Sequence, residues 1–260
     1  MTRLDVWLAK AGLAESREKA QALVMAGRVS VDGRRAEKPG ARVMEGAAVA
    51  VEPGPAHVGR GALKLAGALD ALGVDPAGRV AVDVGASTGG FTETLLGRGA
   101  LRVHAVDVGR GQLHERLARD PRVVVHDRVN ARSLSPAVVP EACSLAVADV
   151  SFISVRLVLP ALLTVLAPGA EMVVLVKPQF EVGRAQVGRG GIVADPALHL
   201  QALRGVAAEA QRLGCAVRGA CPSPVPGAEG NREFFLHLVP GGAALGEAEL
   251  ESVLGKAVSP

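Results

Sequence analysis

Short apolar runs that alternate with amphipathic stretches are the feature that most constrains the fold of this chain. From residue 80 onward the runs consist mainly of Val, Ala and Leu in unbroken order, which is typical of parallel strands buried on both faces. The stretches between the runs have the apolar spacing of helices. We expect strands at residues 80–84, 102–106, 122–126, 145–149, 172–177, 215–221 and 233–239. The alternation predicts an α/β fold with one mostly parallel sheet covered by helices on both faces.

The last two runs, residues 215–221 and 233–239, follow a helical pattern at 196–213 and are joined by a short segment rich in Pro and Gly. A short connection favours an antiparallel pair at the sheet edge, because parallel strands need a longer crossover. Seven strands with the last one inserted antiparallel resemble the sheet of the class I, Rossmann-like methyltransferases.

The composition excludes several classes of protein. With 49% hydrophobic residues and a net charge of +3, the chain can form a folded core and is not disordered. No apolar run reaches the ~20 residues of a membrane-spanning helix. Three cysteines without ligand spacing indicate neither disulfides nor a metal site, and the six histidines, also without ligand spacing, are expected on the surface or at strand ends. We expect a cytoplasmic protein with no bound metal and no membrane contact.

Positive charge is concentrated at the N-terminus. Residues 1–60 contain ten Lys and Arg against seven Asp and Glu, whereas residues 61–260 contain nineteen of each kind. A Pro and Gly stretch then separates the basic segment from the rest. The expected organisation is a small phosphate-binding domain at residues 1–52, a linker at 53–62 and a large domain at 63–260.

The N-terminal segment combines two amphipathic helices with a strand, an Asp32-Gly33 turn and a second strand. The sequence RLDVWLAKAGLAESREKAQALVMAGRVSVDGR resembles the S-four RNA-binding domain, or alpha-L motif, from Arg3 to about Val51. The resemblance implies a small α+β domain that docks on structured RNA through phosphates and shape, which suits a chain without Tyr. From charge alone, a solvated surface remains the alternative. The expected RNA-binding residues are Arg3, Arg17, Lys19, Arg28, Arg34, Arg35 and, in the linker, Arg60.

A glycine-rich turn follows the first strand of the large domain, in the order Asp-x-Gly-x-x-x-Gly-Gly. A dinucleotide fold would need a second glycine at Ser87 to admit a pyrophosphate. A nucleoside without phosphates tolerates that side chain, and the pattern resembles motif I of S-adenosylmethionine (SAM) enzymes. Asp107 after the second strand is placed to accept the ribose hydroxyls of an adenosine. The expected cofactor-binding residues are Asp83, Gly85, Ala86, Ser87, Thr88, Gly89, Gly90, Phe91, Asp107, Asp127 and Asn130.

Two charged side chains end neighbouring strands, Asp149 after the fourth and Lys177 after the fifth. Open α/β sheets bind their reactants at these strand ends. A buried ion pair without a catalytic role is the simpler alternative. Lys64 and Glu233 could complete a ring of alternating charges with them.

This set resembles the Lys-Asp-Lys-Glu tetrad of 2′-O-ribose methyltransferases. From Arg3 to about Val239 the chain resembles the TlyA family of rRNA methyltransferases, historically called hemolysins, whose catalytic half has the FtsJ-like fold. The shared segments are GRGALKL, VDVGASTGGFT, VADVSFISV, VKPQFEVGR, GRGGIV and SPVPGAEGNREFF. The resemblance implies SAM-dependent methylation of a ribose 2′-hydroxyl, of a cytidine, in ribosomal RNA. Lys64, Asp149, Lys177 and Glu233 are then the catalytic residues, with Lys177 as the amine nearest the hydroxyl.

Three other functions remain open. A non-catalytic rRNA-binding assembly factor could hold SAM as a structural ligand, but it would not need all four tetrad side chains. A membrane-lytic protein would need a spanning or Lys-rich amphipathic helix. A base methyltransferase would have a different motif after the fourth strand, where this chain has Asp149-Val150-Ser151-Phe152. Phe152 and Phe180 could pack against the target nucleotide or belong to the core. The target nucleotide, the subunit that carries it and the oligomeric state do not follow from the sequence.

Overall fold

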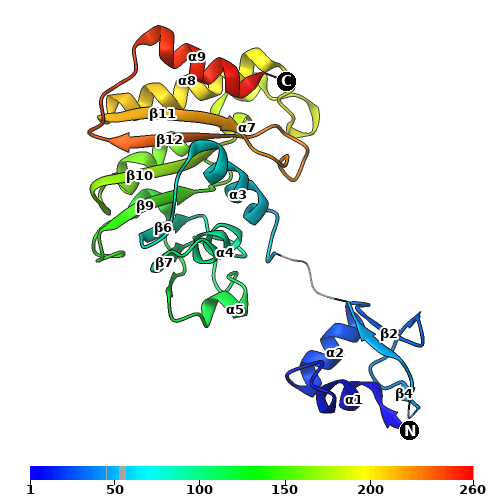
Figure 1. Cartoon of the computed structure of the whole chain (residues 1–260). Helices are drawn as coiled ribbons and strands as arrows, with labels where there is room; N and C mark the ends of the chain where they lie inside the picture. The colour runs from blue at the N-terminus through cyan, green and yellow to red at the C-terminus, as the bar shows by residue number, and fades with distance from the viewer. Residues whose placement is uncertain (45, 53–56, 260) are drawn as a thin grey trace. The chain divides into compact units, whose positions relative to one another are not determined.

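The computed structural model describes residues 1–44, 46–52 and 57–259. The chain divides into two compact units, Met1–Ala56 and His57–Pro260, and each is described by itself (Figure 1). Residues 53–56 of the predicted linker lie outside the described residues, and residues 57–62 of that linker belong to the second unit.

The first unit packs two helices against short strands. Helices α1 (Leu4–Lys10) and α2 (Arg17–Met25) bury Leu4, Leu8, Ala20 and Val24 in a small core. The Ser16 hydroxyl accepts a hydrogen bond from the Lys19 amide and so begins α2. Strands β1 (Thr2–Arg3) and β4 (Arg42–Val43) form one antiparallel pair, and β3 (Arg34–Arg35), β2 (Val29–Val31) and β5 (Val49–Val51) form a three-stranded sheet. Asp32 and Gly33 connect β2 to β3 with φ values of 50° and 75°, the geometry of a two-residue hairpin turn.

The second unit is built on a seven-stranded sheet. Its strands are β6 (Val80–Val84), β7 (Arg102–Val106), β8 (Val123–His126), β9 (Cys143–Ala148), β10 (Leu166–Val176), β11 (Cys215–Pro222) and β12 (Phe234–Pro240). Their order in the sheet is β11-β12-β10-β9-β6-β7-β8. Strand β12 lies between β11 and β10 and is antiparallel to both, and the remaining pairs are parallel. The predicted mostly parallel sheet with its antiparallel edge pair is therefore confirmed.

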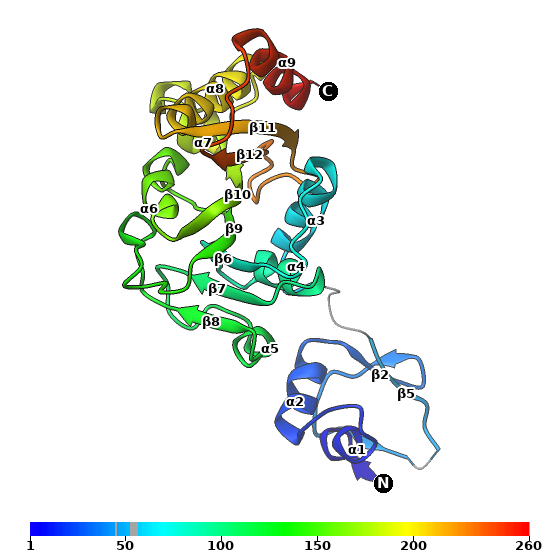
Figure 2. The same cartoon turned by 60° about the vertical axis from the view of Figure 1, so that its left-hand side comes forward.

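Helices cover both faces of this sheet (Figures 1 and 2). Side chains of α3 (Gly61–Leu72), α4 (Gly90–Gly97) and α5 (Glu115–Ala118) join one apolar cluster. Those of α6 (Leu159–Leu163), α8 (Pro196–Arg212) and α9 (Glu247–Val258) join the other. One short helix, α7 (Pro178–Glu181), and the 3-10 turns η1 (Ala131–Ser133), η2 (Val155–Leu157), η3 (Arg184–Gln186) and η4 (Arg189–Gly191) lie in the connections.

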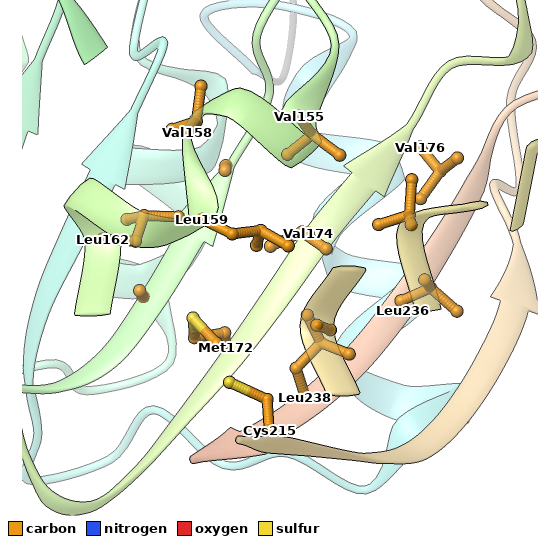
Figure 3. Close-up of a cluster of buried hydrophobic side chains, with 14 of the residues drawn as sticks. Val155, Val158, Leu159, Leu162, Met172, Val174, Val176, Cys215, Leu236 and Leu238 are labelled. Carbon is orange, nitrogen blue, oxygen red and sulfur yellow. The ribbon is translucent and has the colours of Figure 1, made fainter. Parts of the chain in front are cut away.

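The core on the α8 side fixes the ends of the central strands. Figure 3 shows Val155 of η2 in the same cluster as Val174 and Val176 of β10 and Leu236 of β12. Interiors of this kind are packed as densely as organic crystals, so groups attached at the strand ends have little freedom to move. Among the described helices, none has the length and apolar character needed to cross a membrane.

Three histidines differ from the prediction that places them on the surface or at strand ends. His104, His199 and His237 are buried. Each has a hydrogen-bond partner that offsets the loss of water: Glu141 contacts His104, the Val193 carbonyl accepts from His199, and Glu171 contacts His237. Glu141 and Glu171 are distant in the sequence from the histidines that they contact, so no local pattern indicates the burial of His104 and His237.

Candidate active site

The glycine turn after β6 brings three elements into close contact. Gly85 has φ of 85°, and a Cβ there would collide with the backbone oxygen of Asp149 at the end of β9. A Cβ on Gly90 would lie 2.7 Å from the Ala62 amide nitrogen, at the start of α3. The turn therefore leaves room for the close approach of β6, β9 and α3 only because these positions lack side chains.

A cavity of about 410 Å³ opens at the carboxyl ends of β6, β7 and β9. Its walls include Gly85 and Ser87 from the glycine turn, Asp107 after β7, Asn130 before η1 and Asp149 after β9. A second cavity, of about 120 Å³, shares Gly85, Ser87 and Asp149 with the first and adds Arg60, Thr88 and Phe91. The larger volume lies in the range of small-molecule sites.

The polar residues predicted to bind a cofactor occupy different places around this cavity. The Asp107 carboxylate accepts hydrogen bonds from the Ser87 amide at 2.8 Å and from the Gly109 amide at 2.7 Å. Asn130 lines the cavity and its side chain caps η1. Asp127 is exposed, accepts a hydrogen bond from the Gly111 amide and is not part of the cavity wall.

The small residues of the glycine turn lie next to the second cavity. Ala86 and Gly90 line the smaller cavity, and Gly89 is the N-cap residue of α4 with φ of 98°.

Asp83 is buried beneath the turn. The Thr92 hydroxyl donates a hydrogen bond to Asp83 Oδ2 at 2.7 Å, and Oδ1 is buried without a partner among the described residues. Burial raises the pKa of Asp83 to about 7, the bonds from Thr92 oppose the rise, and the negative charge of Asp149 adds to it. Asp83 therefore has one acceptor atom, two residues before Gly85 of the glycine turn, that no described residue contacts by a hydrogen bond.

Lys177 and Asp149 meet at the ends of β10 and β9. Lys177 Nζ lies 2.5 Å from Asp149 Oδ1 as an ion pair, and its directed hydrogen bond goes to Ser151 Oγ at 2.8 Å. Lys177 is buried, whereas Asp149 is partly open to the cavity. Sequence reasoning did not single out Ser151, because a serine two residues after a strand end has no distinguishing pattern.

Lys64 and Glu233 form a second buried pair. Lys64 Nζ on α3 donates to Glu233 Oε2 at 2.5 Å. The antiparallel register pairs Val176 with Phe234, so the next position places Lys177 opposite Glu233. The structure thus places the four predicted catalytic side chains in two ion pairs, one at the ends of β9 and β10 and one between α3 and the start of β12.

In the first unit, a buried carboxylate organises two of the predicted RNA-binding arginines. Asp5 accepts hydrogen bonds from Arg3 at 3.0 and 3.1 Å, from Arg17 at 3.0 Å and from Gln21 at 2.8 Å. These donors, Arg3 foremost, hold the pKa of Asp5 well below its usual range.

The other predicted RNA-binding residues lie elsewhere on the two units. Arg28 donates to the backbone oxygen of Glu52, and Arg34 and Arg35 are exposed on β3. Lys19 is exposed on α2. Arg60 belongs to the second unit, where it lines the smaller cavity.

The seven-stranded sheet with its inserted antiparallel strand is the fold expected of a methyltransferase, and the comparisons with known proteins show the FtsJ-like class. Residues 57–239 match the FtsJ-like methyltransferase family, and residues 2–49 match the S4 domain. The chain belongs to the TlyA family. It is 49% identical over 260 residues, 99% of this chain and 97% of its relative, to the 16S/23S rRNA (cytidine-2′-O)-methyltransferase TlyA of Mycobacterium tuberculosis.

Two further relatives carry the hemolysin name. Hemolysin A of Brachyspira hyodysenteriae is 35% identical over 91% of this chain and 99% of its own. A solved structure from Streptococcus thermophilus is 40% identical, covers 98% of this chain and 95% of its own, and superposes with a TM-score of 0.73. The shared architecture confirms the predicted fold class, and the FtsJ-like match together with the 49% identical rRNA methyltransferase confirms the predicted methyltransferase activity.

Proposed function

We propose that the protein transfers a methyl group from SAM to the ribose 2′-hydroxyl of a cytidine in ribosomal RNA. The observation that carries the proposal is the pairing of Lys177 with Asp149, which lines the cavity at the strand ends, and of Lys64 with Glu233. The rRNA cytidine-2′-O-methyltransferase named above, at 49% identity over nearly the whole chain, supports the choice of substrate. If ribosomal RNA is its substrate, the protein acts in the cytoplasm.

The residues around the cavity fit SAM. Asp107 offers carboxylate oxygens to the ribose hydroxyls, and Asn130 offers an amide to the adenine edge. Asp83 lines neither cavity, but its Oδ1, which has no hydrogen-bond partner among the described residues, offers an acceptor close to the glycine turn. When bound, SAM supplies a methyl group activated by a positive sulfur.

Lys177 performs the central step in this proposal. A ribose hydroxyl is a weak nucleophile at neutral pH, so the enzyme must orient its oxygen and stabilise it as the proton leaves. Lys177 Nζ contacts that oxygen and either accepts its proton or stabilises the alkoxide while the proton passes to water, and Asp149 and Ser151 hold the amine in place. Glu233 holds Lys64, which steers the ribose or its phosphate.

The RNA is held at two places. Phe152 lines the cavity with 90% of its surface exposed, and its ring centroid lies 5.5 Å from that of Phe180. An exposed ring at a cavity rim is suited to stack on an unpaired base. The S4 domain contacts phosphates of folded rRNA with its arginines, which gives sequence-independent affinity.

The test of this proposal is the Lys177→Ala variant. We expect methyl transfer to ribosomal subunits to fall by roughly 10²–10⁴-fold, the usual contribution of such a group, while SAM affinity stays unchanged. Tritium transfer and mapping of 2′-O-methyl sites measure the result. Lys256→Ala, which alters an exposed lysine on α9, is the control and should keep full activity.

Two results would count against the proposal. Full activity of Lys177→Ala would overturn the assignment of the tetrad. A parent protein that binds SAM and rRNA but transfers no methyl group would instead indicate the assembly-factor alternative.

A further inference from the structure

The connection between β9 and η2 carries two groups that face the proposed reaction. Ser151 accepts the directed hydrogen bond of Lys177, and Phe152 is exposed at the cavity rim. Phe152 has φ of 63°, a left-handed conformation that is strained for a residue with a bulky side chain. Strained backbone persists only where its surroundings over-determine it. We therefore expect contacts that fix the two ends of this connection.

At its first end the connection is fixed by the sheet. The Asp149 amide donates to the Val84 carbonyl at 2.9 Å, which continues the pairing of β9 with β6. Within residues 150–153, the described residues show one side-chain hydrogen bond, which Lys177 donates to Ser151. The geometry of Ser151 and Phe152 therefore depends on how the second end is held.

Glu181 holds the second end. It lies at the last position of α7, four residues after Lys177, and its side chain is only 2% exposed. The Ser154 hydroxyl donates to Glu181 Oε2 at 2.6 Å, and the Val155 amide donates to Oε1 at 2.7 Å. Arg156 Nε donates to Oε2 at 3.1 Å, and Arg156 also donates to the Glu181 backbone oxygen. One buried carboxylate thus receives donors from three consecutive residues.

The core reinforces this anchor. The Val155 side chain is buried with Val174 and Val176 of β10, the strand that leads into Lys177 (Figure 3). The Lys177 carbonyl accepts from the Phe180 amide at 2.9 Å, so α7 begins directly at the amine-bearing residue. The contacts close a ring that runs from Lys177 through α7 to Glu181, across to Ser154, and back through Ser151 to Lys177.

We infer that Glu181 is a positioning residue for methyl transfer: by fixing residues 154–156 it sets the place of Ser151 against Lys177 and of Phe152 at the cavity rim. Loss of its carboxylate lets the connection relax from the strained conformation at Phe152. Ser151 then no longer holds the Lys177 amine in the direction of the substrate oxygen. The inference rests on the proposed function, because it assigns Lys177 to the reacting hydroxyl.

The experiment is a double-mutant cycle on the full-length protein with SAM and ribosomal subunits. We expect Glu181→Gln and Ser151→Ala each to lower kcat at least tenfold and to change KM for the RNA less than threefold. Because both substitutions act on the same contact, the double variant should be no slower than the slower single variant. Ser151→Thr keeps a hydroxyl and should recover most of kcat. Ser154→Ala deletes one bond to Glu181 and should give a smaller loss in kcat, which keeps the test open if Glu181→Gln does not fold.

Glu141→Gln is the matched control. Glu141 also accepts from an arginine and a second donor, but it precedes β9 and so lies at the opposite end of that strand from Asp149. Its substitution should leave kcat within twofold, and its effect should be additive with that of Ser151→Ala. Parent-like kcat in Glu181→Gln, or additive losses in the double variant, would overturn the inference. If the parent is active and Lys177→Ala is not, the proposed function still stands in that case. Failure of the proposed function would show separately, as a parent protein without transfer.

Discussion

Asp83 shows how burial, with a smaller contribution from neighbouring carboxylates, can raise the pKa of one carboxyl group. Its pKa is about 7 in the folded protein, against 3.8 for an unperturbed aspartate. Between these pH values the folded state binds more protons than the unfolded state, so stability falls as pH rises. We expect the parent to lose a few kcal/mol of unfolding free energy relative to Asp83→Asn between pH 4 and pH 8, since one pKa unit corresponds to ~1.4 kcal/mol. Urea unfolding of both proteins across this range measures the difference.

A second variant sharpens this residue-scale test. Thr92→Val removes the hydroxyl that donates to Asp83, so the pKa of Asp83 should rise further and the pH window should extend upward. A parent and an Asp83→Asn variant with parallel stability curves would show that Asp83 does not titrate in this window.

At the residue scale, the sequence predicts the groups that end strands but not those that support them. Parallel strands finish at one edge, so the meeting of Asp149 and Lys177 follows from the strand pattern. Ser151 and Glu181 could not be predicted in this way, because their contacts join two connections that have no periodicity. Asp127 stays a prediction as a cofactor contact, although its carboxylate accepts from Gly111 outside the cavity wall.

At the element scale, two glycines of α4 are expected to respond in opposite ways to alanine. A Cβ on Gly90 would lie 2.7 Å from the Ala62 amide nitrogen and would push α3, which carries Lys64, away from α4. A Cβ on Gly97 meets nothing within 4 Å. Gly90→Ala should therefore lower both the melting temperature and methyl transfer, whereas Gly97→Ala should stabilise the protein by ~0.5–1 kcal/mol through helix propensity. Thermal unfolding and a transfer assay compare them, and equal effects would contradict this account of the α3–α4 contact.

Element order was predictable because apolar patterning differs between buried strands and the helices that cover them. The antiparallel pairing of β11 with β12 followed from a connection too short for a crossover, whereas the insertion of β12 between β11 and β10 was implied by the resemblance to the class I methyltransferases. The close approach of α3 to α4 was not predictable, since it depends on a backbone contact between Gly90 and Ala62 that no local pattern encodes. Turns with special backbone angles, such as Asp32-Gly33, were predictable from residue type alone.

At the scale of the whole molecule, the two units have separate cores and different charges. The apolar cluster of the first unit contains residues 4–51, and the clusters of the second unit contain residues 58–258. A chain that lacks residues 1–52 should therefore fold and bind SAM with unchanged affinity. It should lose transfer to ribosomal subunits, because residues 1–52 hold nine Lys and Arg against seven Asp and Glu, whereas the remaining chain holds twenty against nineteen.

The salt dependence of RNA affinity tests the docking role of the first unit without removing it from the chain. Each phosphate contact contributes about 0.7 (single strands) to 0.9 (duplex DNA) to the slope of log affinity against log salt. In the full-length protein, Arg34→Ala with Arg35→Ala should lower that slope by about two if both exposed arginines contact phosphates, while SAM affinity stays constant. Filter binding to rRNA at several salt concentrations measures the slope, and calorimetry measures SAM affinity. Undiminished transfer by the truncated chain would show that the second unit recognises its RNA alone, and an unchanged slope would exclude β3 from the RNA-binding surface.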